Sequence, residues 1–146
     1  MNSLKNTKVE KMTIMEYAAN TGDLHHLKEF HEQGHPWTNY VAQRAARGHL
    51  ACLKYVHEHG CPLETCSYYY AAQGHLDCLT YLYEHGCVCL NWVCEFAAKG
   101  HLECLKYLCE NNCMTDKLAC CVASNDYPDC LNYLSELCEL RELYNL

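Results

Sequence analysis

Residues 71–87, AAQGHLDCLTYLYEHGC, decide the fold of this 146-residue chain because they recur along it. Residues 97–113, AAKGHLECLKYLCENNC, stand 26 positions later and keep the same order of alanine, glycine, histidine, leucine, cysteine and tyrosine. The glycine of this pattern recurs at that spacing, at Gly22, Gly48, Gly74 and Gly100, and Asp126 takes its place in a fifth copy. A short period of this kind is typical of proteins built from stacked units.

The period divides the chain into five blocks, which we number 1 to 5: 12–37, 38–63, 64–89, 90–115 and 116–141. In every block the eighth residue is alanine and the sixteenth is leucine, and the largely apolar positions 13, 15, 16 and 19 share one helical face. Each block therefore predicts a first helix over positions 2 to 10, a turn at the glycine and a second helix over positions 12 to 22. The second helices are expected to close at residues that tolerate the left-handed conformation, namely Gly34, Gly60, Gly86 and Asn112.

One such helix pair cannot bury its own apolar face, so the blocks must stack on one another. We therefore expect an all-α fold, a solenoid of about five stacked helix-turn-helix units with short loops, in a single domain over residues 12–146. Block 5 has no closing glycine, and Asp129 to about Tyr144 is expected to continue as a longer capping helix that begins near Pro128. Residues 1–11 are polar and charged, and we expect a short mobile arm there.

Charge and hydropathy restrict the possible partners. The formal net charge is −7 and no basic stripe is visible, which argues against a nucleic-acid partner. No run approaches the roughly 18 apolar residues of a membrane span, and the first residues lack the apolar core of a secretion signal. We expect an intracellular, cytoplasmic protein with no membrane partner.

The chain has 14 cysteines, and most of them follow the period. Equivalent residues in stacked helices lie roughly 8–10 Å apart, whereas a disulfide requires Cα atoms within about 7 Å. Bridges along a column of equivalent cysteines are therefore not expected, and buried free thiols that act as small hydrophobes are favoured. The two columns are Cys52, Cys78, Cys104 and Cys130, and Cys61, Cys87 and Cys113.

Zinc binding is the alternative for the loops, where cysteine and histidine stand close together. Their spacings match no zinc-knuckle pattern, and His49, His75 and His101 recur with the block, as packing or capping residues would. The favoured interpretation has no metal site and no cofactor. The clusters left open as zinc ligands are His57, His59 and Cys61, and His85, Cys87, Cys89 and Cys94.

Cysteine and histidine also serve in nucleophilic catalysis, but a catalytic pair is needed once and must be oriented by a third group. In this chain both residue types recur with the blocks. The sequence contains no Gly-rich phosphate loop, no G-x-S-x-G motif and no metalloprotease pair. We therefore expect a protein that is not an enzyme.

The motif A-A-x-G-H-L-x-C-L-x-Y-L-x-E-x-G-C, as it stands in residues 71–87, resembles the two-helix portion of an ankyrin repeat. The resemblance covers residues 12–141, although the period is 26 rather than the usual 33 and the missing residues are those of the projecting hairpin loop. The T-P-L-H entry to the first helix is also absent. Short, cysteine-rich units of this kind are similar to ankyrin-like arrays encoded by large DNA viruses of amoebae, which would place the protein in a host cytoplasm or nucleus.

Positions that vary between blocks while the scaffold is kept are candidates for recognition, and positions 3, 6 and 10 form one stripe on the first helix. The resemblance implies a concave surface built from first-helix residues and the loops before them. A protein or peptide partner is expected there, since tyrosine and tryptophan suit binding hot spots. The candidate residues are Tyr40, Gln43, Arg47, Thr65, Tyr69, Gln73, Asn91, Trp92, Glu95 and Lys99.

Alternatives remain open for both the site and the function. Tyr40 and Trp92 could equally be core residues that replace the missing hairpin, because large aromatic side chains are as common in cores as in interfaces. The chain is expected to be a monomer, since its end blocks are polar. The other functions left open are a self-assembling structural unit and an adaptor that recruits a target to a ubiquitin ligase through another protein.

Overall fold

The computed structural model describes residues 12–64, 66–90, 92–113 and 126–144, and in this part of the chain every regular element is an α-helix. The all-α prediction is confirmed for these residues. The arm expected over residues 1–11 and the first helix expected in block 5 lie outside them. The helices are α1 (Ile14–Thr21), α2 (Leu24–Glu32), α3 (Asn39–Ala45), α4 (Leu50–Glu58), α5 (Cys66–Ala71), α6 (Leu76–Glu84), α7 (Trp92–Ala97), α8 (Leu102–Glu110) and α10 (Pro128–Tyr144).

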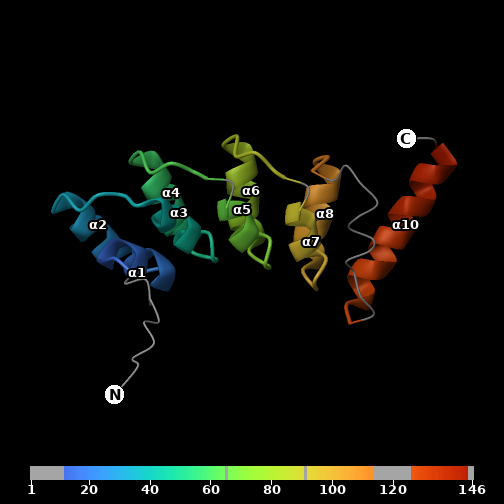
Figure 1. The fold of residues 1–146 in the computed structure, drawn as a ribbon, viewed down its shortest axis with the longest axis horizontal. Helices are drawn as coiled ribbons and strands as arrows, with labels where there is room; N and C mark the ends of the chain where they lie inside the picture. The colour runs from blue at the N-terminus through green and yellow to red at the C-terminus, as the bar shows by residue number, and fades with distance from the viewer. Residues whose placement is uncertain (1–11, 65, 91, 114–125, 145–146) are drawn as a thin grey trace, which may run out of the picture.

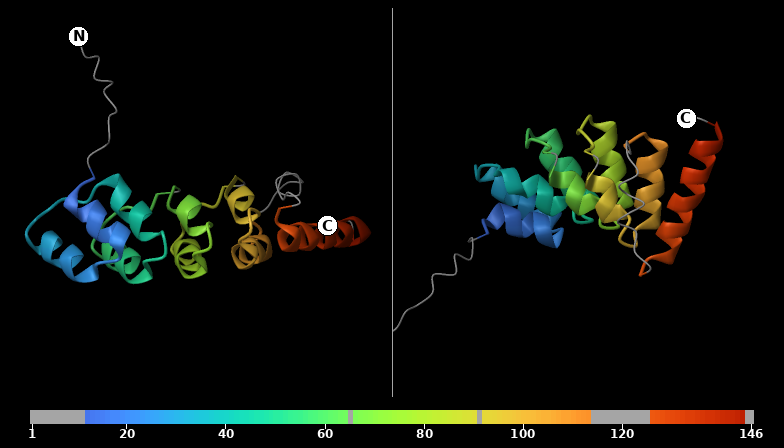
Figure 2. Two further views of the ribbon diagram at one scale, coloured as in Figure 1. Left: turned by 90° about the horizontal axis from the view of Figure 1, so that it is seen from below. Right: turned by 45° about the vertical axis from the view of Figure 1, so that its right-hand side comes forward.

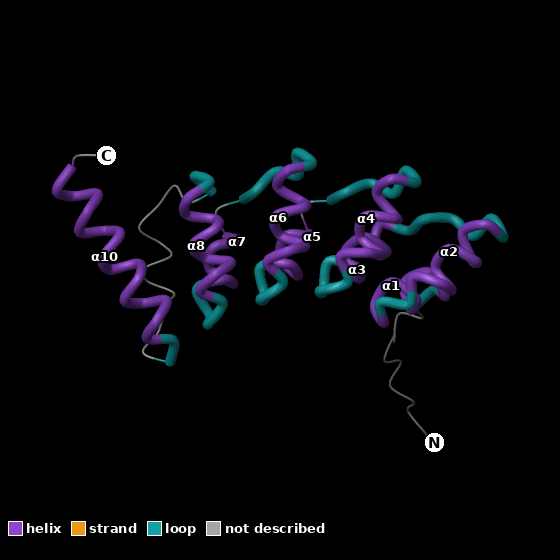
Figure 3. The backbone as a smooth tube through the Cα atoms, turned by 180° about the vertical axis from the view of Figure 1, so that it is seen from behind, coloured by secondary structure: helices purple, strands orange, loops and turns teal. Residues whose placement is uncertain are grey.

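The helices form two rows, with neighbours in each row packed in chain order. The first helices of blocks 1 to 4 follow one another as α1, α3, α5 and α7, and the second helices follow as α2, α4, α6 and α8, with α10 packed against α8. Figure 1 shows the succession of helix pairs, and the left view of Figure 2 shows the two rows. Seen from behind in Figure 3, the short turns within pairs lie along one edge and the longer connections between pairs lie along the other.

The ends of the second helices follow the repeated residues. These helices begin at the leucine of the motif in each described block, at Leu24, Leu50, Leu76 and Leu102. The predicted closing residues have positive φ, with values of 85° at Gly34, 86° at Gly60, 75° at Gly86 and 55° at Asn112. Because only glycine and, less readily, asparagine adopt this conformation without strain, the predicted closing residues are confirmed.

Side chains near the ends of α4, α6 and α8 cap carbonyl groups of these helices. The Nδ1 atoms of His59 and His85 donate to the carbonyl oxygen four residues earlier, at 2.7 and 2.8 Å. In block 4, Nδ2 of Asn111 makes the equivalent hydrogen bond at 2.8 Å. These bonds satisfy carbonyl groups that have no partner within the helix, so histidine at this position acts as a cap.

The first helices are shorter than predicted. Positions 2 to 10 of a block would extend a helix to Gln73 or Lys99, whereas α5 and α7 have six residues each. The backbone N–H of Gln73 donates to the carbonyl of Tyr70, and that of Lys99 donates to Phe96, both at 3.2 Å. This i to i+3 bonding tightens the chain into a turn before the glycine, which ends the helix early.

The core is a continuous layer to which the first helices contribute alanines and some larger residues such as Tyr68, and the second helices contribute leucines and cysteines. The motif leucines Leu27, Leu53, Leu79 and Leu105 are fully buried. The cysteines of the first column, Cys52, Cys78, Cys104 and Cys130, are at most 2% exposed. Their thiols are unbridged, and those of Cys104 and Cys130 donate to the carbonyls of Ala71 and Ala97 in the preceding blocks, at 3.8 and 3.9 Å. The predicted packing role of this column is confirmed.

The seam between successive blocks contains a histidine packed on a glycine. Gly48 has φ 108°, and a Cβ built on it would lie 2.7 Å from Nδ1 of His75 in the next block. The position therefore requires glycine for its conformation and for this close approach. Equivalent contacts recur at the other described seams: His49 on Gly22, His101 on Gly74 and, with tyrosine in place of histidine, Tyr127 on Gly100. The packing role expected for these histidines is confirmed.

The terminal helix α10 agrees with the prediction for the end of the chain. It begins at Pro128, where proline lacks only a backbone N–H that the first turn does not use. Cys130 and Leu134 are buried on the side of α8, while Glu136 and Glu139 are exposed. The helix therefore covers the last described pair with an apolar face and exposes acidic residues to solvent.

Candidate functional site

Three aromatic rings from two neighbouring blocks form a continuous group on the row of first helices. Tyr69 and Tyr70 lie in α5, and their ring centroids are 4.9 Å apart with an interplanar angle of 80°. Phe96 in α7 meets Tyr69 edge to face, with centroids 4.3 Å apart and an angle of 82°. Edge-to-face pairs are favoured because the positive ring edge meets the negative face. The arrangement ties the first helices of blocks 3 and 4 together.

Two cations cover the ends of this aromatic group. The guanidinium carbon of Arg47, which follows α3, lies 4.3 Å from the centroid of Tyr70. The ammonium of Lys99, which follows α7, lies 4.8 Å from the centroid of Phe96. Both distances are within the range of attractive cation–π contacts. We call this surface the aromatic strip, and its members are Arg47, Tyr69, Tyr70, Gln73, Phe96 and Lys99.

The polar groups of the strip differ in how fully they are satisfied. The amide of Gln73 donates to the carbonyl of Tyr69 at 3.3 Å. The Nε of Arg47 is buried and has no hydrogen-bond partner among the described residues. A buried donor without an acceptor is unusual in proteins, so the Nε of Arg47 is an incompletely satisfied group of the strip. A carboxylate is the acceptor that best matches a guanidinium.

The strip arises from residues near the end of each first helix and in the turn that follows it. Positions 6, 7 and 10 of block 3 are Tyr69, Tyr70 and Gln73, and positions 7 and 10 of block 4 are Phe96 and Lys99. Residues three or four apart are neighbours on a helix, and packing of α5 against α7 adds the next block. A line of side chains across three blocks is the result.

The structure brings together four of the ten predicted partner-binding residues in this strip: Arg47, Tyr69, Gln73 and Lys99. Tyr40 is 48% exposed on α3, so it is a surface residue and the core alternative is wrong for it. Glu95 is half-buried and adjoins Phe96 in α7. Thr65 and Asn91 lie outside the described residues, as does the side chain of Trp92.

Gln43 is a buried structural residue rather than an exposed binding residue. Its side chain is 7% exposed, and its amide donates to Glu64 of the next block at 3.5 Å. At the seam before, Thr38 donates to the buried carboxylate of Glu16 at 2.6 Å. Position 6 therefore faces a neighbouring block in block 2 but the strip in block 3, and periodic position alone did not distinguish these environments.

Tyr70 and Phe96 belong to the strip but were missed in the sequence analysis. Both occupy position 7, which lies three residues before the predicted recognition position 10 and so shares its helix face. Position 7 also varies between blocks, with Arg44 in block 2. Variation together with this spacing was the signal that could have identified them.

The histidines proposed as alternative zinc ligands are engaged elsewhere. A hydrogen bond of 2.8 Å joins Nδ1 of His57 to the hydroxyl of Tyr81 in the next block, and His59 caps its own helix. Cys61 is buried. Within the residues that the structure describes, no group of three or more histidine, cysteine, aspartate or glutamate side chains is placed to hold a metal ion.

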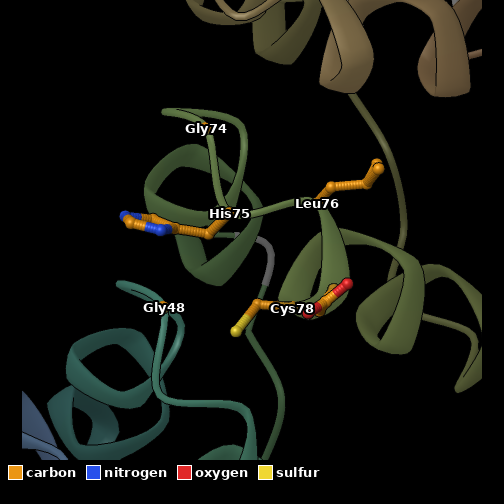
Figure 4. Close-up of a pocket in the computed structure, with 6 residues that line it drawn as sticks. Gly48, Gly74, His75, Leu76 and Cys78 are labelled. Carbon is orange, nitrogen blue, oxygen red and sulfur yellow. The ribbon is translucent and has the colours of Figure 1, made fainter.

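A shallow hollow of about 250 Å³ lies at the seam between blocks 2 and 3. Figure 4 shows its lining, with His75 and Cys78 extending from the start of α6 near Gly48. Burial lowers the pKa of His75, and the neighbouring His101 and His49 lower it further. Because its histidine and glycine recur at other seams, we assign the hollow to block packing rather than to a specific site.

No protein-family model matches the sequence, and no curated protein matches it significantly. Among the described helices, none has both the length and the apolar character needed to cross a bilayer.

Proposed function

We propose that this protein is a shortened ankyrin-like solenoid and acts as a non-enzymatic module that binds a protein or peptide through the aromatic strip. The observation that carries the proposal is the arrangement of Arg47 and Lys99 over a row of three packed aromatic rings. Aromatic residues and arginine are the commonest hot spots of protein interfaces. The ordered packing of helix pairs supports the solenoid part of the proposal.

The chemistry of the strip favours a partner segment with a carboxylate beside an apolar side chain. The guanidinium carbon of Arg47 lies 4.3 Å from the ring centroid of Tyr70, and the guanidinium is the donor that a partner carboxylate would meet. The ring surfaces of Tyr69 and Phe96 supply apolar area next to it. Cations preorganised on aromatic rings lose little side-chain entropy on binding, which favours affinity.

The buried thiols support a function other than catalysis. Burial raises the pKa of Cys52 and Cys104 to about 11 and that of Cys94 to about 12. A thiol of this kind stays protonated at neutral pH, and the protonated form is a poor nucleophile. These cysteines are therefore suited to packing.

The test is selection of random linear peptides displayed on phage, followed by affinity measurement on the enriched sequences. We expect enrichment of aspartate or glutamate next to an aromatic or aliphatic residue. The double variant Arg47→Ala/Lys99→Ala should then bind these peptides about tenfold more weakly or worse, since a hot-spot side chain contributes more than about 1–2 kcal/mol. Far-ultraviolet circular dichroism would check that the helices remain.

The second row offers a matched control. The ammonium groups of Lys28 and Lys54 lie 5.4 and 5.7 Å from the ring centroids of Tyr55 and Tyr81. The variant Lys28→Ala/Lys54→Ala changes the net charge by the same amount and removes the same kind of contact, but away from the strip. Equal weakening by both double variants, or none by the first, would show that the strip is not the binding surface.

A further inference from the structure

The two cations of the aromatic strip mark its two ends. Arg47 and Lys99 both occupy position 10, in blocks 2 and 4, with block 3 between them. The guanidinium carbon of Arg47 lies 4.3 Å from the Tyr70 ring, whose centroid is 4.9 Å from that of Tyr69. Phe96 follows at 4.3 Å, and the ammonium of Lys99 lies 4.8 Å from its ring. These successive distances keep the two cations within about 18 Å of each other.

The stacking of the blocks gives a similar separation. The helices α3, α5 and α7 pack in order. Because packed helices lie about 8–10 Å apart, equivalent positions two blocks apart are separated by about 16–20 Å. An extended chain rises about 3.3 Å per residue, so this length corresponds to roughly five residues of a bound segment. The strip is therefore long enough to contact a short extended peptide at both of its charged ends.

The strip is accessible from one end to the other. The side chains of Gln73 and Lys99 are exposed, and those of Arg47, Tyr70 and Phe96 are half-buried. The middle of the strip is aromatic, while the ends are positively charged. A complementary segment therefore has an apolar middle and a negative charge on either side of it.

The charge of the rest of the molecule makes the position of these cations important. The formal net charge is −7, which repels an acidic segment at long range. The members of the strip include two cations and no carboxylate. Arg44, in the last turn of α3, adds positive charge at the block 2 end. An acidic segment is therefore attracted where its carboxylates reach the ends of the strip and repelled where they do not.

We propose, on the basis of the function proposed above, that the strip binds an extended segment with two carboxylates four to six residues apart and an apolar side chain between them. Alternate side chains of an extended chain share one face, so residues four apart span about 13 Å and residues six apart about 20 Å. One carboxylate then pairs with Arg47, the other pairs with Lys99, and the apolar side chain covers the rings. Carboxylates only two residues apart span about 7 Å, which is too short to reach both cations.

A helical segment would require a different spacing. A helix rises about 1.5 Å per residue, so acidic residues four apart are only about 6 Å apart along its axis. Reaching from Arg47 to Lys99 would take about three turns, with the two acidic residues about eleven positions apart. The preferred spacing of the two carboxylates therefore reports the conformation of the bound segment.

The test is a titration of the full chain, labelled with ¹⁵N, with synthetic peptides, followed by NMR. Each peptide carries one phenylalanine in a glycine–serine background, with a glutamate two residues before it and a second glutamate two, four or nine residues after it. Separations of four and six residues should bind about threefold more tightly than the same peptides with the second glutamate changed to glutamine, as expected for an exposed ion pair. Salt at about 300 mM should remove this gain.

Double-mutant cycles assign each carboxylate to its cation. Changing one glutamate of the peptide should lose its effect in Arg47→Gln, and changing the other should lose its effect in Lys99→Gln, because coupled groups give non-additive changes. Lys54→Gln, in the second row, is the matched control and should couple to neither glutamate. Far-ultraviolet circular dichroism checks that each variant keeps its helices.

The outcomes separate this inference from the function on which it rests. Chemical-shift changes confined to the strip, with no gain from the second glutamate, would overturn the inference and leave the proposed function standing. Coupling of both glutamates to Arg47 alone, or tightest binding at a separation of eleven residues, would do the same. Shift changes away from the strip, or none with any peptide, would overturn both proposals.

Discussion

The seams between blocks and the aromatic strip use similar residues for different purposes. At the second-helix seams, the hydroxyls of Tyr55 and Tyr81 are hydrogen-bonded to His31 and His57 of the preceding block, at 2.9 and 2.8 Å. Lysines also cover these rings. Each of these contacts recurs once, 26 positions later along the chain.

The strip contains aromatic and cationic residues that do not recur. Position 7 is Arg44, Tyr70 and Phe96 in blocks 2 to 4, and position 10 is Arg47, Gln73 and Lys99. Their contacts therefore differ at every seam. The comparison teaches that identical chemistry is structural where it repeats and is available for recognition where it varies.

The strongest way to break a repeated seam is Gly48→Ala. The backbone at Gly48 has a positive φ, and an L-residue with a Cβ in such a conformation costs about 1–2 kcal/mol. The new Cβ would also press on Nδ1 of His75. With overpacking, the expected loss is about 2–4 kcal/mol in the free energy of unfolding, measured by urea denaturation. Gly60→Ala is the matched control, because Gly60 has φ 86° and no atom within 4 Å of an added Cβ. Equal losses in the two variants would mean that the histidine contact has no energetic role.

A milder change compares one tyrosine from each region. Tyr81→Phe removes the hydroxyl that His57 bonds across the seam and should cost about 1 kcal/mol of unfolding free energy. Tyr70→Phe keeps the ring face against which Arg47 packs and should change stability by less than about 0.5 kcal/mol. Denaturation of both variants under the same conditions would check the difference, and a larger loss for Tyr70→Phe would contradict the division between seam and strip.

The smallest expected effect is on the pH dependence of stability. Because the pKa of His75 is lowered from 6.5 in the folded state, the unfolded chain binds more protons below about pH 6.5. The contribution of His75 is fully present above that pH and is lost as the pH falls. His75→Gln should therefore flatten the decline in unfolding free energy between pH 7 and 5, measured by urea denaturation at each pH.

His26 provides the opposite sign for the same experiment. Its hydrogen bond to Asp23 raises its pKa, so its stabilising contribution is present below about pH 6.5 and is lost as the pH rises through the folded value. His26→Gln should therefore steepen the decline in stability toward acid. Identical slopes for the two variants would contradict the assignment of His75 to a packed seam and His26 to an exposed pair.

Much of the scaffold could be predicted because its determinants are local. The positive-φ residues, from Gly34 to Asn112, each end a helix through their own conformational preference. Pro128 starts α10 for the same kind of reason. The site was harder to predict, because the environment of Gln43 or Tyr70 depends on a neighbouring helix rather than on its own segment.

The 26-residue period determines which residues are equivalent, where helices begin and end, and which cysteines can fill a column, since each depends on interactions within one block. It does not determine which position of one block meets which position of the next. Only the packed structure brings Phe96 to Tyr69 and His75 to Gly48. The physical reason is that these pairs depend on the lateral offset of stacked helices, which the combined packing of many side chains sets and no single segment encodes.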